Sequence, residues 1–112
     1  MAARIKRVYE KPGPDDGYRV LVDRLWPRGV SKEGAELDEW LKDVAPSPEL
    51  RTWFGHRPER FAEFSERYAA ELDGSPALAH LRGLVEDHDT VTLVLAAKDP
   101  EHNHGLVLLD QL

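Results

Sequence analysis

Residues 18–23 read YRVLVD, and residues 90–97 read TVTLVLAA. Both stretches contain three or more consecutive apolar residues, a pattern typical of strands that are covered on both faces, as in a parallel sheet. Polar residues follow at once, because Asp23 closes the first stretch and Lys98 and Asp99 come after the second. The two stretches therefore predict the central strands of an α/β domain.

The segment between these strands is predicted to be largely helical. A capping side chain followed by proline marks three helix starts, at Ser47-Pro48, Ser75-Pro76 and Asp99-Pro100. The clearest helix spans about residues 58–72, where apolar side chains recur every three or four positions. The last of these starts follows the strand at 90–97, so that strand and helix form half of an α/β unit.

The first ten residues predict a short polar strand at the edge of the sheet. Only about eight residues connect it to the strand at 18–23, fewer than the dozen or so that a parallel crossover normally needs. The two strands are therefore antiparallel or separated by another strand. We expect a single compact α/β domain over residues 1–112, with a small, mostly parallel sheet of about three strands flanked by helices.

The composition excludes several classes of protein and site. The chain has 112 residues, a net charge of −6 and no cysteine, so disulfides, thiolate nucleophiles and cysteine metal ligands are excluded. It contains no run of about 18 apolar residues that could span a membrane and no apolar stretch typical of a secretory signal. The acidic balance disfavours nucleic acid as a partner. We expect a cytoplasmic protein, and the sequence leaves its oligomeric state open.

Polar side chains gather in the two segments that follow the predicted central strands, residues 23–29 and 98–104. Ligands of open α/β sheets bind beyond the carboxyl ends of the strands. We therefore expect Arg24, Arg28 and Lys98 to hold a phosphate or a carboxylate, since arginine and lysine are the usual donors to such groups. Backbone N–H groups at the start of the last helix are expected to add to this anion site.

Structural ion pairing is the alternative explanation for the same residues. Asp23 would then pair with Arg28. Asp99 would cap the helix that begins at Pro100 and occupy the N–H groups that an anion needs. The sequence leaves both possibilities open.

Histidines supply the candidate proton-transfer groups. We expect Asp23, His56 or His102 to move protons in the site, and Asn103 to contact the ligand. His102 and His104 lie two positions apart, a poor spacing for a metal chelate on a helix. We therefore expect no metal ion and no cofactor, with a metal site formed by His56, His102 and His104 kept as an alternative. The chain has no nucleophile or dinucleotide-binding motif.

Aromatic residues provide either the walls of a pocket or a surface for a partner. Trp26 and Trp53 lie beside candidate site residues, and we expect them to line the pocket or to stack on a planar ligand. The alternative is an interaction module in which Trp26, Trp53 and Phe54 form an exposed patch for a protein partner. Trp40 is predicted to lie in the core, on a helix, because of the spacing of its apolar neighbours.

Three blocks of the sequence resemble a known family. Residues 17–29, GYRVLVDRLWPRG, resemble the signature of the YeaO-like family, small bacterial proteins that carry the domain of unknown function DUF488. Residues 53–56, WFGH, and 96–99, AAKD, followed by His102-Asn103, are similar to its other two blocks, and the resemblance extends from about residue 5 to the end of the chain. It implies a compact α/β domain in the bacterial cytosol, and it supplies no activity.

The chain also departs from the wider grouping, which tends to have Cys-His-Arg where this sequence has Asn103-His104-Gly105. Any activity that depends on that cysteine is therefore not shared. The residues together predict a protein that binds or converts a small anionic metabolite, and they leave open whether it is an enzyme.

Overall fold

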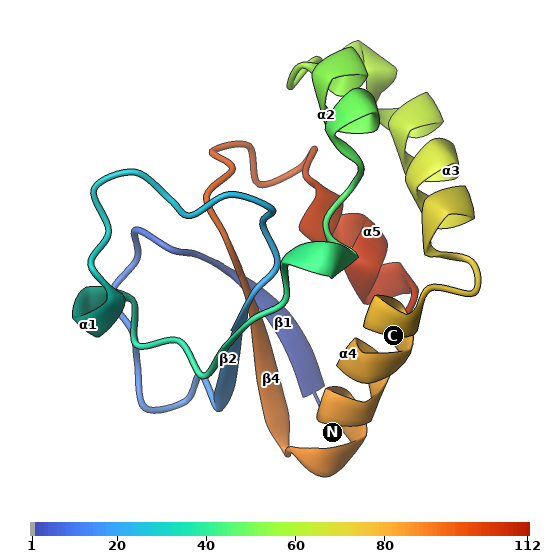
Figure 1. The fold of residues 1–112 in the computed structure, drawn as a ribbon. Helices are drawn as coiled ribbons and strands as arrows, with labels where there is room; N and C mark the ends of the chain where they lie inside the picture. Colours follow the sequence, from blue (N-terminus) through green and yellow to red (C-terminus); the bar gives the residue numbers. More distant parts are fainter. Residues whose placement is uncertain (1) are drawn as a thin grey trace.

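The structure is a computed structural model that describes residues 2–112, and it is built on one parallel sheet (Figure 1). Met1, the first residue of the predicted domain, lies outside this range. The sheet has four strands in the order β1-β4-β2-β3, with all neighbours parallel. The strands are Ala2–Arg7 (β1), Tyr18–Leu21 (β2), Glu39–Trp40 (β3) and Thr90–Leu95 (β4). The predicted α/β class and parallel sheet are confirmed, and the two-residue β3 brings the number of strands to four.

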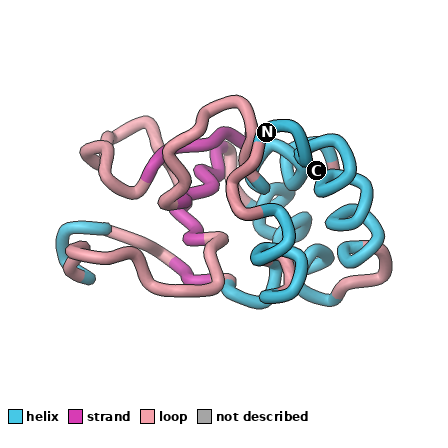
Figure 2. Tube along the Cα trace, turned by 90° about the horizontal axis from the view of Figure 1, so that it is seen from above, coloured by secondary structure: helices cyan, strands magenta, loops and turns pink. Residues whose placement is uncertain are grey.

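The helices are Lys32–Ala35 (α1), Pro48–Phe54 (α2), Phe61–Leu72 (α3), Pro76–Asp87 (α4) and His104–Asp110 (α5), with 3₁₀ turns at Lys42–Val44 and Pro58–Arg60. α2 to α5 gather on one side of the sheet, and α1 lies on the other side among loops (Figure 1, Figure 2). The sheet is thus flanked by helices mainly on one face, whereas the short α1 and loops cover the other face, on which helices were also expected. No helix within residues 2–112 is both long and apolar enough to cross a membrane.

The strand β4 lies between β1 and β2 and is parallel to both. Ala3 of β1 and Tyr18 of β2 are both in register with Val91. The prediction that another strand separates the first two is confirmed, and the antiparallel alternative is wrong. The crossover from β1 to β2, residues 8–17, contains no helix. Side-chain contacts therefore have to fix this loop against the sheet.

Alternate residues of the two central strands enter two different apolar clusters, as the two-residue repeat of a strand requires. Val20 and Leu93 face the helices, where they join a core that includes Phe64 and Tyr68 of α3. Leu21 and Val94 face the loops and pack with Val8, Ala35 and partly buried Trp26. Burial on both faces is the reason that these strands read as continuous apolar runs.

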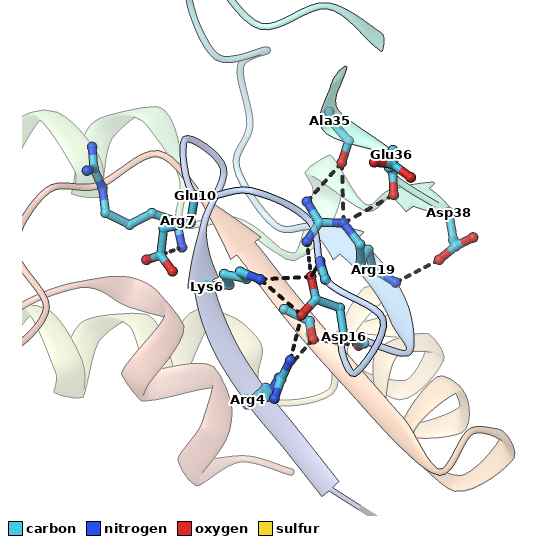
Figure 3. Close-up of polar contacts among 11 residues, drawn as sticks. Arg4, Lys6, Arg7, Glu10, Asp16, Arg19, Ala35, Glu36 and Asp38 are labelled. Atoms are coloured by element: carbon cyan, nitrogen blue, oxygen red, sulfur yellow. Dashed lines mark hydrogen bonds and ion pairs between the residues drawn. The ribbon is translucent and has the colours of Figure 1, made fainter. Parts of the chain in front are cut away.

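The carboxylate of Asp16 organises the β1–β2 crossover (Figure 3). Its side chain is 2% exposed and forms ion pairs with Arg4 at 2.5 Å, Lys6 at 3.1 Å and Arg19 at 2.6 Å. The backbone N–H of Gly13 donates to it at 3.0 Å. Burial alone would raise the pKa of Asp16, but these hydrogen bonds outweigh it and hold the pKa well below its usual range.

The buried guanidinium of Arg19 extends this network to the loop side of the sheet. Besides its bond to Asp16, it donates to the carbonyl of Ala35 at 2.8 Å and to that of Glu36 at 3.1 Å (Figure 3). The hydroxyl of Thr92 on β4 donates to the backbone carbonyl of Asp16 at 2.6 Å. The loop at residues 8–17 is thus connected by hydrogen bonds and ion pairs to β1, β2 and β4 and, through Arg19, to the end of α1.

The residue after Asp16 has to be a glycine. Gly17 has a φ of +64°, and a Cβ atom at this position would lie 2.2 Å from the carbonyl oxygen of Thr90. The loop therefore approaches β4 more closely than any other residue type permits. This explains the glycine at the start of the 17–29 block.

Two of the three predicted helix starts are confirmed. The hydroxyls of Ser47 and Ser75 accept from the backbone N–H groups three residues on, at the starts of α2 and α4. The third start is wrong, because α5 begins four residues after Pro100 and is capped by Asn103. The prediction that Trp40 lies in the core on a helix is also wrong, since Trp40 lies in β3 and is 40% exposed.

Replacing Asp16 by asparagine is expected to lower the free energy of unfolding by about 3 kcal/mol or more, because it leaves the buried Arg19 without its charge partner. Urea unfolding of the two proteins at neutral pH measures the loss. Asp15→Asn, a change at the exposed neighbour, is the matched control and should be near neutral. An equal loss in both variants would contradict the role of the buried carboxylate.

The same carboxylate is expected to make the protein sensitive to acid. Since the native pKa of Asp16 lies below the ordinary value of 3.8, its stabilisation is complete above that value and is lost as the pH falls toward the native pKa. Unfolding measured from pH 6 down to about pH 2 should show stability falling with pH, with a smaller fall in Asp16→Asn. Parallel curves for the two proteins would show that other carboxylates govern acid unfolding.

Candidate functional site

A cleft of about 540 Å³ lies where the central strands end. One wall is the loop after β2, residues 23–27, and another is formed by residues 96–99 and 102–104, which connect β4 to α5. Residues of α2, α3 and the segment at 45–46 close the remaining side. The cleft therefore forms at the carboxyl ends of neighbouring parallel strands, where the sequence placed it.

The structure brings most, but not all, of the predicted site residues to this cleft. The lining includes seven of them: Asp23, Arg24, Trp26, His56, Lys98, His102 and Asn103. Arg28 and Trp53 are absent from the lining. Arg28 is exposed on the loop after the cleft, where its backbone carbonyl accepts a hydrogen bond from Tyr9.

The two strand-end loops are joined by Asp23. One carboxylate oxygen accepts from the backbone N–H of Ala96 at 2.9 Å, and the other lies 3.3 Å from Nε2 of His104. The same Nε2 lies 3.1 Å from the carbonyl oxygen of Val22. Both neighbours of Nε2 are acceptors, so the proton of a neutral His104 ring is on Nε2. Asp23 does not pair with Arg28, and the predicted ion pair is wrong.

A second aspartate–histidine pair lies within the loop after β4. The carboxylate of Asp99 accepts from the backbone N–H groups of Glu101 and His102 and lies 2.9 Å from Nδ1 of His102. The N–H of Glu101, followed by the His102 ring, lowers the pKa of Asp99 below its ordinary value. The His102 ring also packs edge-on against Phe61, with 5.4 Å between centroids. This arrangement leaves Nε2 of His102 as the ring nitrogen free to meet a ligand.

Asn103 is a structural residue as well as a lining residue. Its side chain is buried, accepts from the N–H of Leu106 at 3.1 Å and donates to the carbonyl of Asp99 at 2.8 Å. It therefore caps α5, the role that the sequence had assigned to Asp99. The amide oxygen occupies the N–H of Leu106, one of the groups that an anion at the start of α5 would use. The contribution of backbone N–H groups to an anion site stays a prediction.

Packing explains the glycine at position 105, where the wider grouping tends to have arginine. A Cβ atom there would lie 3.0 Å from side-chain carbons of both Ile5 and Leu95. A larger side chain would need these apolar groups to move.

The cations of the cleft differ from its carboxylates in having no charge partner. The Arg24 guanidinium donates to the backbone carbonyls of Ala45 and Pro46, at 3.0 and 3.3 Å. Within residues 2–112, none of Arg24, Arg51 and Lys98 forms an ion pair with a carboxylate. The sequence missed Arg51, because it lies on α2, far from either strand end in the chain, and has no motif around it.

His56 reaches the cleft through an unusual backbone conformation. α2 ends at two successive residues with positive φ, Gly55 at +54° and His56 at +58°. Positive φ is uncommon for a residue with a side chain and costs free energy. The turn places the exposed His56 among the lining residues.

The aromatic residues do not form the exposed patch that the interaction hypothesis requires. Phe54 is buried, with its ring stacked on Phe64 at 4.4 Å between centroids. Trp53 is half-buried and lies beside the guanidinium groups of Arg60 and Arg67, at 5.3 and 4.5 Å from its ring centroid. Of the two tryptophans predicted to line the pocket, Trp26 lines the cleft and Trp53 does not.

Histidines of the cleft do not assemble into a metal centre. Within residues 2–112, no group of three or more histidine or carboxylate side chains is placed to hold a metal ion. The alternative of a site formed by His56, His102 and His104 therefore has no support in the geometry.

Comparisons with known proteins agree with the resemblance of the three sequence blocks. A family model described as "Inactive DUF488-N3 subclade" matches residues 2–112. The uncharacterized protein Rv3073c of Mycobacterium tuberculosis is 51% identical over 109 residues, which cover 97% of this chain and 92% of the relative. The uncharacterized protein YeaO of Escherichia coli is 43% identical over 112 residues, which cover 100% of this chain and 97% of the relative. No solved structure matches the chain significantly.

The two histidines are expected to hold opposite tautomers when neutral. His104 carries its proton on Nε2, since that nitrogen faces two acceptors, and His102 carries it on Nδ1, which faces the carboxylate of Asp99. Long-range proton–nitrogen NMR spectra of the imidazoles distinguish the two forms. The same tautomer on both rings would contradict this description of the cleft. His80, whose Nε2 lies 2.7 Å from a carboxylate oxygen of Glu39, provides a comparison ring that should also carry its proton on Nε2.

Proposed function

The chain belongs to the YeaO-like DUF488 family, and from this membership and the cleft we propose that the protein binds a small organic anion. The ligand occupies the cleft between the loops that follow β2 and β4. Arg51 and Lys98 hold its charged group, with Arg24 and His56 beside them. We also propose that the protein acts in the bacterial cytoplasm, as its composition suggests.

The balance of charge within the cleft carries this proposal. Both carboxylates, Asp23 and Asp99, are occupied by backbone N–H groups and by a histidine. Within the described residues 2–112, Arg24 donates only to backbone carbonyls, and neither Arg51 nor Lys98 forms an ion pair, although the whole chain has a net charge of −6. A cleft that retains unpaired cations in an acidic protein attracts anions and orients them by hydrogen bonds to guanidinium and ammonium groups.

Binding without turnover agrees best with the residues of the cleft. The position where the wider grouping tends to have cysteine is held by Asn103, whose amide is used to cap α5. An amide is not a nucleophile, and the chain has no cysteine elsewhere. The description of the matching subclade as inactive supports the same conclusion.

Proton transfer to or from the bound anion is a second candidate function. It is favoured by the Asp99–His102 pair, which orients the ring and leaves Nε2 free, as in a general base. NMR of candidate anions incubated with the protein tests for conversion. Conversion that is lost in His102→Gln, with binding retained, would support this function, and no conversion in the wild type would exclude it for those anions.

Organic phosphates and carboxylates are expected to raise the melting temperature at constant ionic strength. A ligand at about a hundred times its dissociation constant adds about 2.7 kcal/mol, which shifts a domain of this size by several degrees. Arg51→Ala and Lys98→Ala should each lose most of the shift, since each removes an unpaired cation. Arg28→Ala is the matched control, because Arg28 does not line the cleft, and its shift should equal that of the wild type. No shift in the wild type with any anion would refute the proposal.

His56→Gly is expected to separate stability from binding. Glycine adopts positive φ without strain, so this variant should be at least as stable as the wild type, whereas His56→Ala keeps the strain and gains nothing. Both variants should show a smaller anion-induced shift, because both lose the imidazole. Thermal unfolding with and without anion measures the two effects, and full binding by both variants would remove His56 from the site.

A further inference from the structure

We infer that the ligand of the cleft is an aromatic anion, with a planar ring attached to its phosphate or carboxylate group. This inference rests on the proposed function and specifies the class of ligand. The observation behind it is that the unpaired cations occupy only part of the cleft, and that apolar side chains of the loop after β2 form another part of its lining.

The size of the cleft exceeds what a bare oxyanion requires. A volume of about 540 Å³ lies within the range of pockets that enclose drug-sized organic molecules. Inorganic phosphate would contact Arg51 and Lys98 but would leave most of the apolar wall in contact with water. An organic body on the anion displaces that water and gains the free energy of apolar burial.

The apolar wall comes mainly from the loop after β2. Leu25, Trp26 and Pro27 all line the cleft, and Leu25 is 59% exposed, so its side chain is open to a ligand. The only polar atom of the Trp26 side chain, Nε1, donates to the carbonyl of Val30 at 2.8 Å. Trp26 therefore has only apolar ring surface to offer to the cleft.

The orientation of the Trp26 ring is fixed before any ligand binds. The ring forms an edge-to-face pair with Trp40, with 5.5 Å between centroids and 71° between the planes. Trp40 in turn is held by a hydrogen bond from its Nε1 to the carbonyl of Asp23 at 2.7 Å. A flat, immobilised ring favours a flat partner, because stacking then costs little conformational entropy.

Binding of matched pairs of anions tests the inference. Titration calorimetry at constant ionic strength compares methyl phosphate with phenyl and naphthyl phosphate, and acetate with benzoate. Each aromatic anion should bind about ten-fold more tightly than its aliphatic counterpart, as one stacked ring contributes. The phosphate and carboxylate series also show which charged group the cations prefer.

Two variants locate the preference in the proposed wall. Trp26→Leu should reduce the aromatic preference to about two-fold or less while methyl phosphate still binds. Trp40→Leu removes the same aromatic pair but leaves the Trp26 ring in the lining. It should therefore lower the aromatic preference less than Trp26→Leu does, and the difference between the two variants separates stacking on Trp26 from its fixed orientation. Leu25→Ser, at an exposed position, is a second test of the wall that does not disturb the core.

The outcomes separate this inference from the function on which it rests. Equal binding of aromatic and aliphatic anions, with Arg51→Ala still defective, would overturn the aromatic class and leave the anion site standing. A preference that survives in both Trp26→Leu and Leu25→Ser would overturn the assignment of the loop after β2 as the wall that contacts the ring. No binding of any anion would refute the proposed function itself.

Discussion

The buried carboxylate of Asp16 is the contact on which the sheet depends. A parallel crossover normally carries a helix that packs on the sheet, but the connection between β1 and β2 is a loop of residues 8–17. Burying a charge is costly unless other charges and hydrogen bonds compensate for it. Here cations from β1 and β2 and the N–H of Gly13 compensate for the buried charge. These contacts hold the loop in one position against β4.

The cleft follows from the strand order that this network holds. Because β2 and β4 are adjacent and parallel, the loops after them begin side by side, and the carboxylate of Asp23 bonds directly to the N–H of Ala96. His104 then approaches Asp23 from the start of α5. The structural network and the cleft lie at opposite ends of β2, so the stability of the sheet and the chemistry of the cleft use different residues of the 17–29 block.

The acidic side chains of the cleft have partners within the protein, and its arginine and lysine side chains do not pair with them. The carboxylates of Asp23 and Asp99 accept hydrogen bonds from loop backbone and from histidine, and these bonds hold the loops and the imidazole rings in place. In the part of the chain that the structure describes, Arg51 and Lys98 form no ion pair with a carboxylate. An anion site and internal pairing of the aspartates do not exclude each other. The structure contains internal pairing of both aspartates, through histidine and backbone rather than through Arg28, and cations remain beside them.

The sequence by itself determined the features that depend on neighbouring residues. Continuous apolar runs predicted the two central strands, and the serine–proline pairs predicted two helix starts, because strand burial and helix capping act over a few positions. It also located the cleft, since strand ends meet in any parallel sheet. The predicted helix start at Asp99 is wrong, because Asn103 is also a capping residue and α5 begins after it. This later start accompanies the close packing of Gly105 against Ile5 and Leu95, residues that are distant in the sequence.

Tertiary structure alone decided which side chains meet. Arg51 enters the cleft because α2 packs beside the strand ends, and Arg28 stays outside it although it is only a few residues from Arg24 in the chain. Trp40 lies in an edge strand rather than on a helix because β2 offers it backbone partners. These contacts join residues far apart in the sequence, and their free energy comes from burial and hydrogen bonding that no local pattern records.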